Sequence, residues 1–206
     1  MRRLEIMFWS AGILLILTFL GAHAWGENER QRGITAFAAQ QNSPEVQDHT
    51  VVASAPFLIG ESTLASAELP KSPGDEVLAI LRVAEIGLEL PVRFGTEERV
   101  LRRGPGLIEG TSLPGSNGNV AIAAHRDVHF RGLKDLNLGD RIELESTGRI
   151  QTYIVTDLSV VDPADVHVLD ETGQPVLTLV TCYPFYFVGN APERFIVRAE
   201  AAEFFH

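Results

Sequence analysis

Short apolar runs separated by turn residues fill the second half of the chain. From Glu76 onward, NVAIAAH, GRIQTYIVTDLSVV, QPVLTLVTC and RFIVRAEAA each show the alternating or fully apolar pattern of a strand. Glycine- and proline-rich segments such as RRGPG and LPGSNGN separate them. About eight such strands, with no long helical period between them, predict a mainly β fold. We expect a closed β-barrel with short helices and long loops.

The start of the chain shows a different pattern, one long apolar run. Between Glu5 and Glu27 lie 21 residues without Asp, Glu, Lys or Arg. As a helix they would extend about 30 Å, which matches the hydrocarbon core of a bilayer. The run is therefore expected to form a single transmembrane helix. The two arginines that precede it favour a cytoplasmic N-terminus, so that the rest of the chain would be exported. A cleaved signal peptide is the alternative, because AHA at 22–24 resembles a small-residue cleavage site.

A stretch of linker composition joins the apolar run to the strands. Residues 27–40 allow a short helix with Ile34 and Phe37 on one face, although Gly33 weakens the helical signal. Residues 41–75 contain four prolines among Ser, Gln and Ala, which is typical of a linker. The expected organisation is a membrane anchor over 1–26, an extracytoplasmic helix and linker over 27–75, and a β-barrel domain over 76–206.

Charge and cysteine content restrict the function. The 206 residues carry a net charge of −10, which argues against nucleic acid as a partner. A single cysteine excludes an intrachain disulfide and a Cys-rich zinc site. No His, Cys or carboxylate cluster has ligand spacing, so we expect neither a metal nor another cofactor. The acids Asp162, Asp165 and Asp170 are interpreted as a solvated loop rather than a calcium site.

The single cysteine, Cys182, ends the apolar run LTLVTC. An unpaired thiol in an exported chain is either buried packing or a nucleophile. A nucleophilic thiol needs an acid–base partner, and the chain has six histidines. His125 closes the apolar strand NVAIAAH, the position that Cys182 has on its own strand, whereas His129 and His167 lie in polar segments that are expected to be exposed. The pattern therefore favours His125 as the partner.

Strand alternation predicts which way the candidate side chains face. In three separate strands, His125, Cys182 and Arg194 each point away from the bulkiest apolar neighbours. The face that carries these candidates also carries Ala, Thr and Val, and it would form the floor of a groove on the outside of the barrel. The bulky residues that would fill the barrel are Val120, Ile122, Leu177, Leu179, Phe195 and Val197.

These residues resemble the motifs of sortases. TLVTC, from Thr178 to Cys182, is similar to the TLxTC signature of that family, and AAHRD places His125 where sortases have a histidine after an apolar strand. RFIVRA places Arg194 at the position of the family's arginine, and Arg198 offers a second arginine on the same face. The resemblance extends from about residue 76 to residue 202 and is greatest to the class D-like sortases of Gram-negative bacteria.

The resemblance implies a membrane-anchored cysteine transpeptidase whose barrel faces the extracytoplasmic or periplasmic space. Its partners would be proteins with an LPxTG-like C-terminal sorting signal and an acceptor amine. Cys182 would attack the threonine carbonyl, His125 would transfer protons, and Arg194 would stabilise the oxyanion. Asp127 is a candidate for orienting His125. The resemblance also implies substrate contacts at Ala123, Thr181 and Tyr183.

Two other classes of protein remain open. A cysteine hydrolase would use the same Cys–His pair and pass the acyl group to water. A non-catalytic, anchored β-barrel binding module would contain an unreactive Cys182. The nearby aromatics Tyr183, Phe185, Tyr186 and Phe187 either line a substrate groove or pack the end of the barrel.

Overall fold

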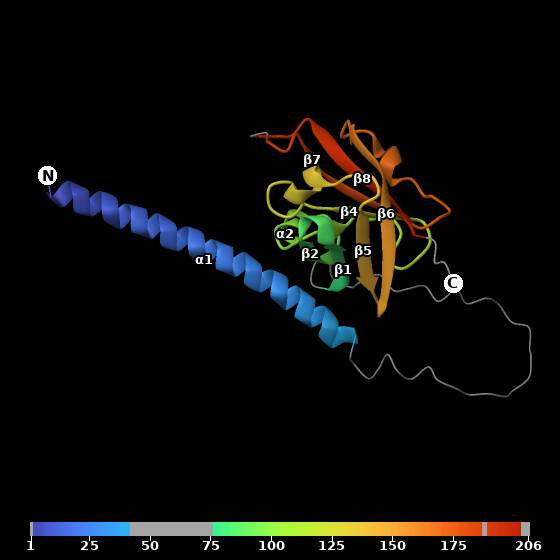
Figure 1. The fold of residues 1–206 in the computed structure, drawn as a ribbon, viewed down its shortest axis with the longest axis horizontal. Helices are drawn as coiled ribbons and strands as arrows, with labels where there is room; N and C mark the ends of the chain where they lie inside the picture. The colour runs from blue at the N-terminus through green and yellow to red at the C-terminus, as the bar shows by residue number, and fades with distance from the viewer. Residues whose placement is uncertain (1, 42–75, 187–188, 203–206) are drawn as a thin grey trace, which may run out of the picture.

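A computed structural model of the chain describes residues 2–41, 76–186 and 189–202. Helix α1 (Arg2–Gln41) runs without a break for 40 residues and projects away from a compact barrel (Figure 1). The short helix expected over 27–40 is therefore the last part of a longer one. Among the described residues, no helix is both long enough and apolar enough to span a membrane, so the expected transmembrane helix is not found there. The expected linker lies almost entirely outside the described residues.

Eight strands close into a barrel in the order β1-β2-β3-β4-β7-β8-β6-β5. The expected closed barrel with short helices is confirmed. Four short helical elements interrupt the strands: η2 (Ala84–Ile86), α2 (Glu98–Leu101), η3 (Arg131–Asp135) and η4 (Val166–Leu169). The strands are β1 (Val77–Val83), β2 (Leu88–Phe94), β3 (Gly106–Leu107), β4 (Asn119–Ala123), β5 (Arg141–Ser146), β6 (Arg149–Val161), β7 (Val176–Tyr183) and β8 (Glu193–Ala201).

The interior of the barrel contains the bulky side chains that alternation assigned to it. Val120, Ile122, Leu177, Leu179 and Val197 belong to one buried cluster, and Phe195 packs against that cluster. Ala121 and Thr178, on the alternate positions, are buried but lie outside it. The predicted division of the strands into a core face and an outer face is therefore confirmed.

The three strands that carry the candidate residues are neighbours in the sheet. β4 pairs in parallel with β7, and β7 pairs antiparallel with β8. A parallel pair needs a long crossover connection, and here the crossover includes η3, β5, β6 and η4. The barrel closure thus places distant segments of the sequence side by side on one wall.

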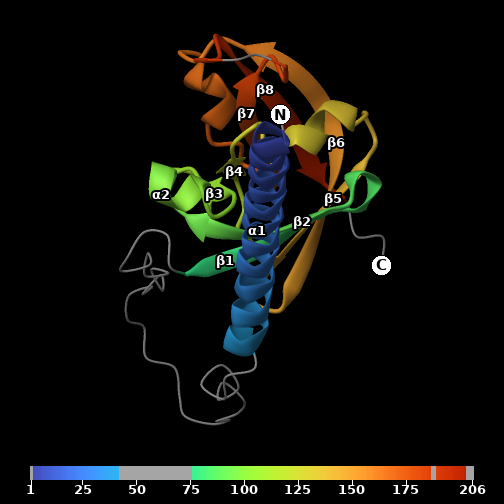
Figure 2. The same cartoon turned by 90° about the vertical axis from the view of Figure 1, so that its left-hand side faces the viewer.

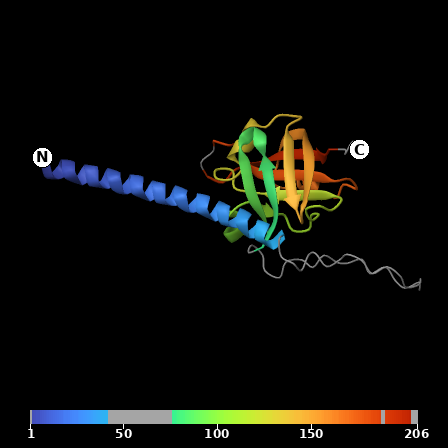
Figure 3. The same cartoon turned by 60° about the horizontal axis from the view of Figure 1, so that its bottom comes forward.

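The C-terminal part of α1 packs against the outer wall formed by β1 and β2. Figure 2 looks along this helix, with the two strands behind it, and Figure 3 shows its last turns meeting the barrel. Phe37, 6% exposed, and Ile34 pack against Val77 and Ile80. A Cβ at Gly33 would lie 2.6 Å from the Pro91 Cγ. The glycine that weakens the helical signal therefore permits the close approach of helix and strand.

Candidate active site

The register of β7 and β8 places one arginine next to the cysteine. Cys182 lies directly opposite Arg194, whereas Arg198 lies opposite Thr178. The Arg194 Nη1 donates hydrogen bonds to the carbonyls of Ala191, at 3.3 Å, and Glu193, at 2.9 Å. The Arg194 side chain is thus partly buried and held near the start of β8, at the level of the thiol.

The register of β4 and β7 brings His125 to the same level. Ala123 is the partner of Val180 in this parallel pair. The Ala124 N–H continues the ladder past the end of β4 by donating to the Val180 carbonyl at 3.2 Å. Two residues beyond that last pair, His125 is level with Cys182. The barrel therefore brings together the three residues predicted from the sequence.

Cys182 is a free, half-buried thiol on the outer face of β7. Its strand neighbours Thr181 and Tyr183 point to the other face, toward the barrel interior. The thiol side of the strand is therefore the predicted groove side, and the bulky side chains lie behind it.

A glutamate that the sequence did not single out lies against the histidine. The His125 Nε2 is 3.5 Å from the Glu98 Oε2, and the His125 side chain is 38% exposed. Arg102, the residue just after α2, donates from Nε to the Glu98 Oε1 at 2.8 Å. This hydrogen bond, with a smaller contribution from the charge of His125, lowers the pKa of Glu98. The sequence lacked a signal for this contact because Glu98 lies far upstream, on a short helix.

Asp127 contacts Arg126 rather than the neighbouring histidine. The Arg126 Nε donates to the Asp127 Oδ1 at 3.0 Å and its Nη2 donates to Oδ2 at 2.9 Å. The hydrogen bond from Arg126 lowers the pKa of Asp127, so the carboxylate stays ionised. The contact that the structure shows for Asp127, a candidate for orienting His125, is therefore with the neighbouring Arg126.

His129 is half-buried, in contrast to the exposed position that its polar loop suggested. Burial is the main cause that lowers the pKa of His129, which favours the neutral ring at physiological pH. Its Nε2 is buried without a hydrogen-bond partner among the described residues. His129 therefore adds a neutral ring, rather than a charge, near His125.

The three expected substrate contacts differ in position. Ala123 is half-buried on the outer face that also carries Cys182. Thr181 is 2% exposed and donates its hydroxyl to the Ala124 carbonyl at 2.8 Å. Tyr183 stacks on Phe195 with ring centroids 6.3 Å apart and meets the edge of Phe185 at 5.9 Å. The Thr181 and Tyr183 side chains thus support the end of the barrel, and of the three only Ala123 lies on the outer face that carries Cys182.

The loop acids behave as turn-forming groups. Asp162 and Asp165 are exposed and accept hydrogen bonds from backbone N–H groups two residues on, at 2.8 Å and 3.3 Å. Asp170 lies 3.1 Å from the His167 Nδ1, and this contact raises the pKa of His167. No group of three or more His, Cys, Asp or Glu side chains that could hold a metal occurs within the described part of the chain.

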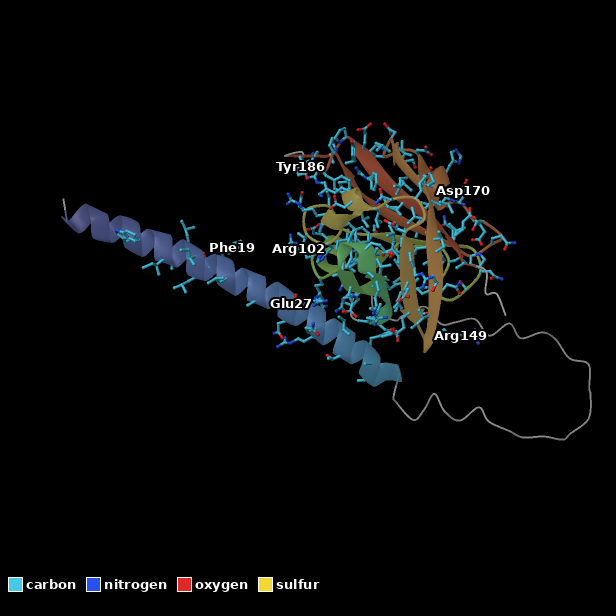
Figure 4. All side chains as sticks on the ribbon, viewed as in Figure 1. Phe19, Glu27, Arg102, Arg149, Asp170 and Tyr186 are labelled. Carbon is cyan, nitrogen blue, oxygen red and sulfur yellow. The ribbon has the colours of Figure 1, made fainter. Side chains whose placement is uncertain are left out.

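Two residues labelled in Figure 4 border the candidate site. Arg102, which binds Glu98 from just after α2, and Tyr186, just after β7, project from the same side of the barrel. Arg149, at the start of β6, lies at the far end. The candidate site is therefore at one end of the barrel, on the side toward which α1 projects.

The protein is therefore a closed β-barrel with a candidate cysteine-based active site on its wall, where a free thiol, a histidine and an arginine lie at the same level on neighbouring strands. The family model of the sortase domain matches residues 81–202. This chain therefore belongs to the sortase family, and the resemblance predicted from its motifs is confirmed.

Known relatives agree with this assignment. Sortase D of Bacillus subtilis is 35% identical over 119 residues, which are 57% of this chain and 60% of that protein. Sortase A of Streptococcus agalactiae is 30% identical over 151 residues, covering 69% of this chain and 59% of that protein. The match thus covers about three fifths of the length of these relatives.

Solved structures show the same fold. A sortase D5 transpeptidase of Clostridium perfringens matches with a TM-score of 0.67 and 24% identity, over 85% of this chain and 99% of that one. Sortase C of the same organism, solved with the C-terminal cell wall sorting motif, matches with a TM-score of 0.59 and 32% identity. That second match covers 66% of this chain and 78% of the other.

Proposed function

We propose that this protein is a cysteine transpeptidase that cleaves a C-terminal sorting signal and transfers the new carboxyl end to an amine. The observation that supports it most is the register, which places Cys182 opposite Arg194 and level with His125. The sorting motif in the related sortase C structure supports an LPxTG-like peptide as the substrate class.

The proposed reaction has two acyl transfers. The Cys182 sulfur, as thiolate, attacks the carbonyl carbon of the scissile threonine, and the C–N bond to glycine breaks as a thioester forms. The His125 imidazolium gives its proton to the departing amine. An acceptor amine then loses a proton to His125 and attacks the thioester, which forms a new amide and releases the thiolate.

Arg194 stabilises the negative oxygen that forms in both tetrahedral intermediates. Its two hydrogen bonds to the Ala191 and Glu193 carbonyls both use Nη1. The Nε and Nη2 groups of a guanidinium provide further donors in a fixed plane. This arrangement suits a donor whose orientation is set before the oxyanion forms.

The experiment that tests the proposal is cleavage of an LPxTG-like peptide in the presence of an amine. Parent protein should yield the amide product, and Cys182→Ala should yield none. A methanethiosulfonate reagent should label Cys182 and block the reaction. Cleavage by Cys182→Ala would contradict the proposal, exclusive formation of the free acid would indicate a cysteine hydrolase, and an unreactive thiol would indicate a binding module.

We further propose that residues 1–26 anchor the protein in a membrane, with the linker and the catalytic barrel outside the cytoplasm. The uncharged run and the exposed apolar side chains from Ile13 to Leu20 on α1 support this. Full-length protein should partition with membranes, and a chain that begins at Asn28 should be soluble and active because it keeps the packing of Phe37. Mature protein that begins at Trp25 would instead indicate a cleaved signal peptide.

A further inference from the structure

Two hydrogen bonds tie the loop after β4 to the end of β7, one on each side of the candidate pair. Thr181 Oγ1 donates to the Ala124 carbonyl at 2.8 Å. Arg126 Nη1 donates to the Pro184 carbonyl at 2.6 Å. Ala124 and Arg126 are the two chain neighbours of His125. Both hydrogen bonds therefore hold residues next to His125 against the end of β7.

The guanidinium of Arg126 is held in a fixed orientation. Arg126 is only 6% exposed, although it is a charged residue in a loop. Its Nε and Nη2 form a fork with both oxygens of Asp127, at 3.0 and 2.9 Å, and this leaves Nη1 directed at Pro184. The hydrogen bond that Arg126 donates to Asp127 raises the pKa of Arg126, so the group stays charged.

Arg126 is also close enough to Cys182 for the two groups to interact electrostatically. Positive groups near the histidine loop include Arg126 in the loop itself, Arg194 on β8, Arg102 just after α2 and Arg131 at the start of η3. The negative groups are Asp127, which is bound to Arg126, and Glu98, which is bound to Arg102. Among these groups, Arg126 is the one that hydrogen-bonds from the histidine loop to the backbone just after Cys182.

We infer that Arg126 is a positioning residue that sets the distance and direction of His125 relative to Cys182. It does so by holding the loop after β4 against the end of β7, and Asp127 acts through it by fixing the guanidinium plane. Lysine cannot replace it, because an ammonium group lacks the planar fork that binds Asp127 and Pro184 together. The predicted effect on rate rests on the proposed transpeptidase function, whereas the predicted geometry does not.

The geometry can be tested without any enzymatic activity. Full-length protein labelled with ¹³C-histidine gives an NMR signal for the His125 ring, and Cys182→Ala should shift it because the strand register brings the two residues to the same level. In protein that also carries Arg126→Ala or Arg126→Lys, the same Cys182→Ala change should no longer shift the signal. A shift of parental size in both backgrounds overturns the inference. If Cys182→Ala leaves the His125 signal unchanged in the parent background, His125 and Cys182 are not neighbours, and the inference is overturned.

The kinetic test uses cleavage of the sorting-signal peptide. Arg126→Ala and Arg126→Lys should each lower kcat about 100-fold, as expected when reacting groups are misplaced by about 1 Å, with KM changed less than about threefold. Arg131→Ala is the matched control, because Arg131 is exposed on η3 and lies over the Tyr186 ring, 5.8 Å from its centroid. It should keep the parental kcat. A lysine variant with parental kcat would show that charge alone suffices and would overturn the inference.

Thermal unfolding of each variant separates positioning from folding. If Arg126→Ala does not fold, Arg126→Lys and Thr181→Val carry the test, since Thr181→Val removes the companion hydrogen bond with little change of shape. Thr181→Val should lower kcat about tenfold. Should both folded variants keep parental kcat, the two connections do not position His125. Cleavage by Cys182→Ala would instead contradict the proposed function, and this outcome is distinct from every outcome above.

Discussion

Two walls of the barrel use the same alternation of side chains for different purposes. On the wall of β1 and β2, the outer face carries the apolar Ile80, and the packing of α1 leaves that side chain 1% exposed. On the wall of β4, β7 and β8, the outer face of β7 carries Thr178, Val180 and Cys182. Thr178 is buried as well, but its hydroxyl donates a 2.7 Å hydrogen bond to Asn119, whose amide donates in turn to the Val168 and Asp170 carbonyls in and just after η4. Apolar outer side chains thus hold a helix on one wall, whereas hydrogen bonds hold a loop on the other wall and leave the half-buried Cys182 at the end of β7.

The largest expected effect is on the reactive wall and concerns its two arginines. Arg194→Ala should lower kcat/KM about 100- to 1,000-fold, or roughly 3 to 4 kcal/mol, through the loss of an oxyanion donor. Arg194→Lys should not restore it, because the planar fork is lost. Arg198→Ala should stay within about tenfold of the parent, since Arg198 lies level with Thr178 rather than Cys182.

Steady-state kinetics on folded variants measures this difference. A collapse of activity in Arg198→Ala, with Arg194→Ala near the parent, would transfer the oxyanion role to the other arginine. It would also show that strand register is a poor guide to function on this wall.

The next largest effect is on the covered wall, where stability rather than chemistry should change. Phe37→Ala should lower the free energy of unfolding by about 3 kcal/mol, because a buried ring is removed from the contact with Val77 and Ile80. Gly33→Val should act in the same direction, since the added Cβ would meet Pro91. Denaturant unfolding measures both, and Ala36→Ser on an exposed position of α1 is the control. A fall in kcat as large as the Arg194 effect, with stability unchanged, would contradict the division between the two walls.

Tyr153, which β6 places in the core between the two walls, gives the expected pH dependence. Its burial is complete, at 0% exposure, and this burial raises the pKa of Tyr153 to about 12. The folded protein therefore holds this proton more tightly than the unfolded chain, whose tyrosine pKa is about 10. The stabilisation is fully present below about pH 10 and is lost as the pH rises to about 12, by roughly 2 to 3 kcal/mol.

Tyr153→Phe isolates this contribution. The hydroxyl has no hydrogen-bond partner among the described residues, so its removal at neutral pH should raise stability by about 1 kcal/mol. Between pH 10 and pH 12 the variant should lose less stability than the parent in the same unfolding series. Equal losses in both proteins would mean that Tyr153 does not control the alkaline transition.

The smallest expected effect is on the ion pairs that border the covered wall. Arg82 binds Glu89 at 2.9 Å and Glu145 at 2.6 Å, and Arg30 of α1 lies 3.5 Å from Glu89. All of these side chains are partly exposed, so Arg30→Ala should change stability by less than about 1 kcal/mol. Higher salt should reduce even this difference. A loss in chemical denaturation larger than that of Phe37→Ala would show that charge contributes more than Phe37 to holding α1 on the barrel.

The sequence predicted the parts of the protein that depend on local pattern. Alternation alone separated Leu177 and Leu179 from Cys182, and the ends of two apolar runs identified His125 as its partner. It could not predict the contact of Glu98 with His125 or the bond from Arg126 to Pro184, because those contacts join segments that only barrel closure brings together. The role of Gly33 could not be predicted for the same reason, because the contact with Pro91 that requires a glycine is long-range.

The parallel pairing of β4 with β7 also has a consequence for the order of folding. Ala124 and Thr181, which this pairing joins, are 57 residues apart in the chain, and hairpins alone cannot bring them together. The entropy of closing so long a loop must be offset by many contacts formed at once, so such pairings form slowly. We expect the thiol to meet its histidine only when the barrel closes. A chain that is still folding would then carry an unassembled site, and the proposed reaction would wait for the finished barrel.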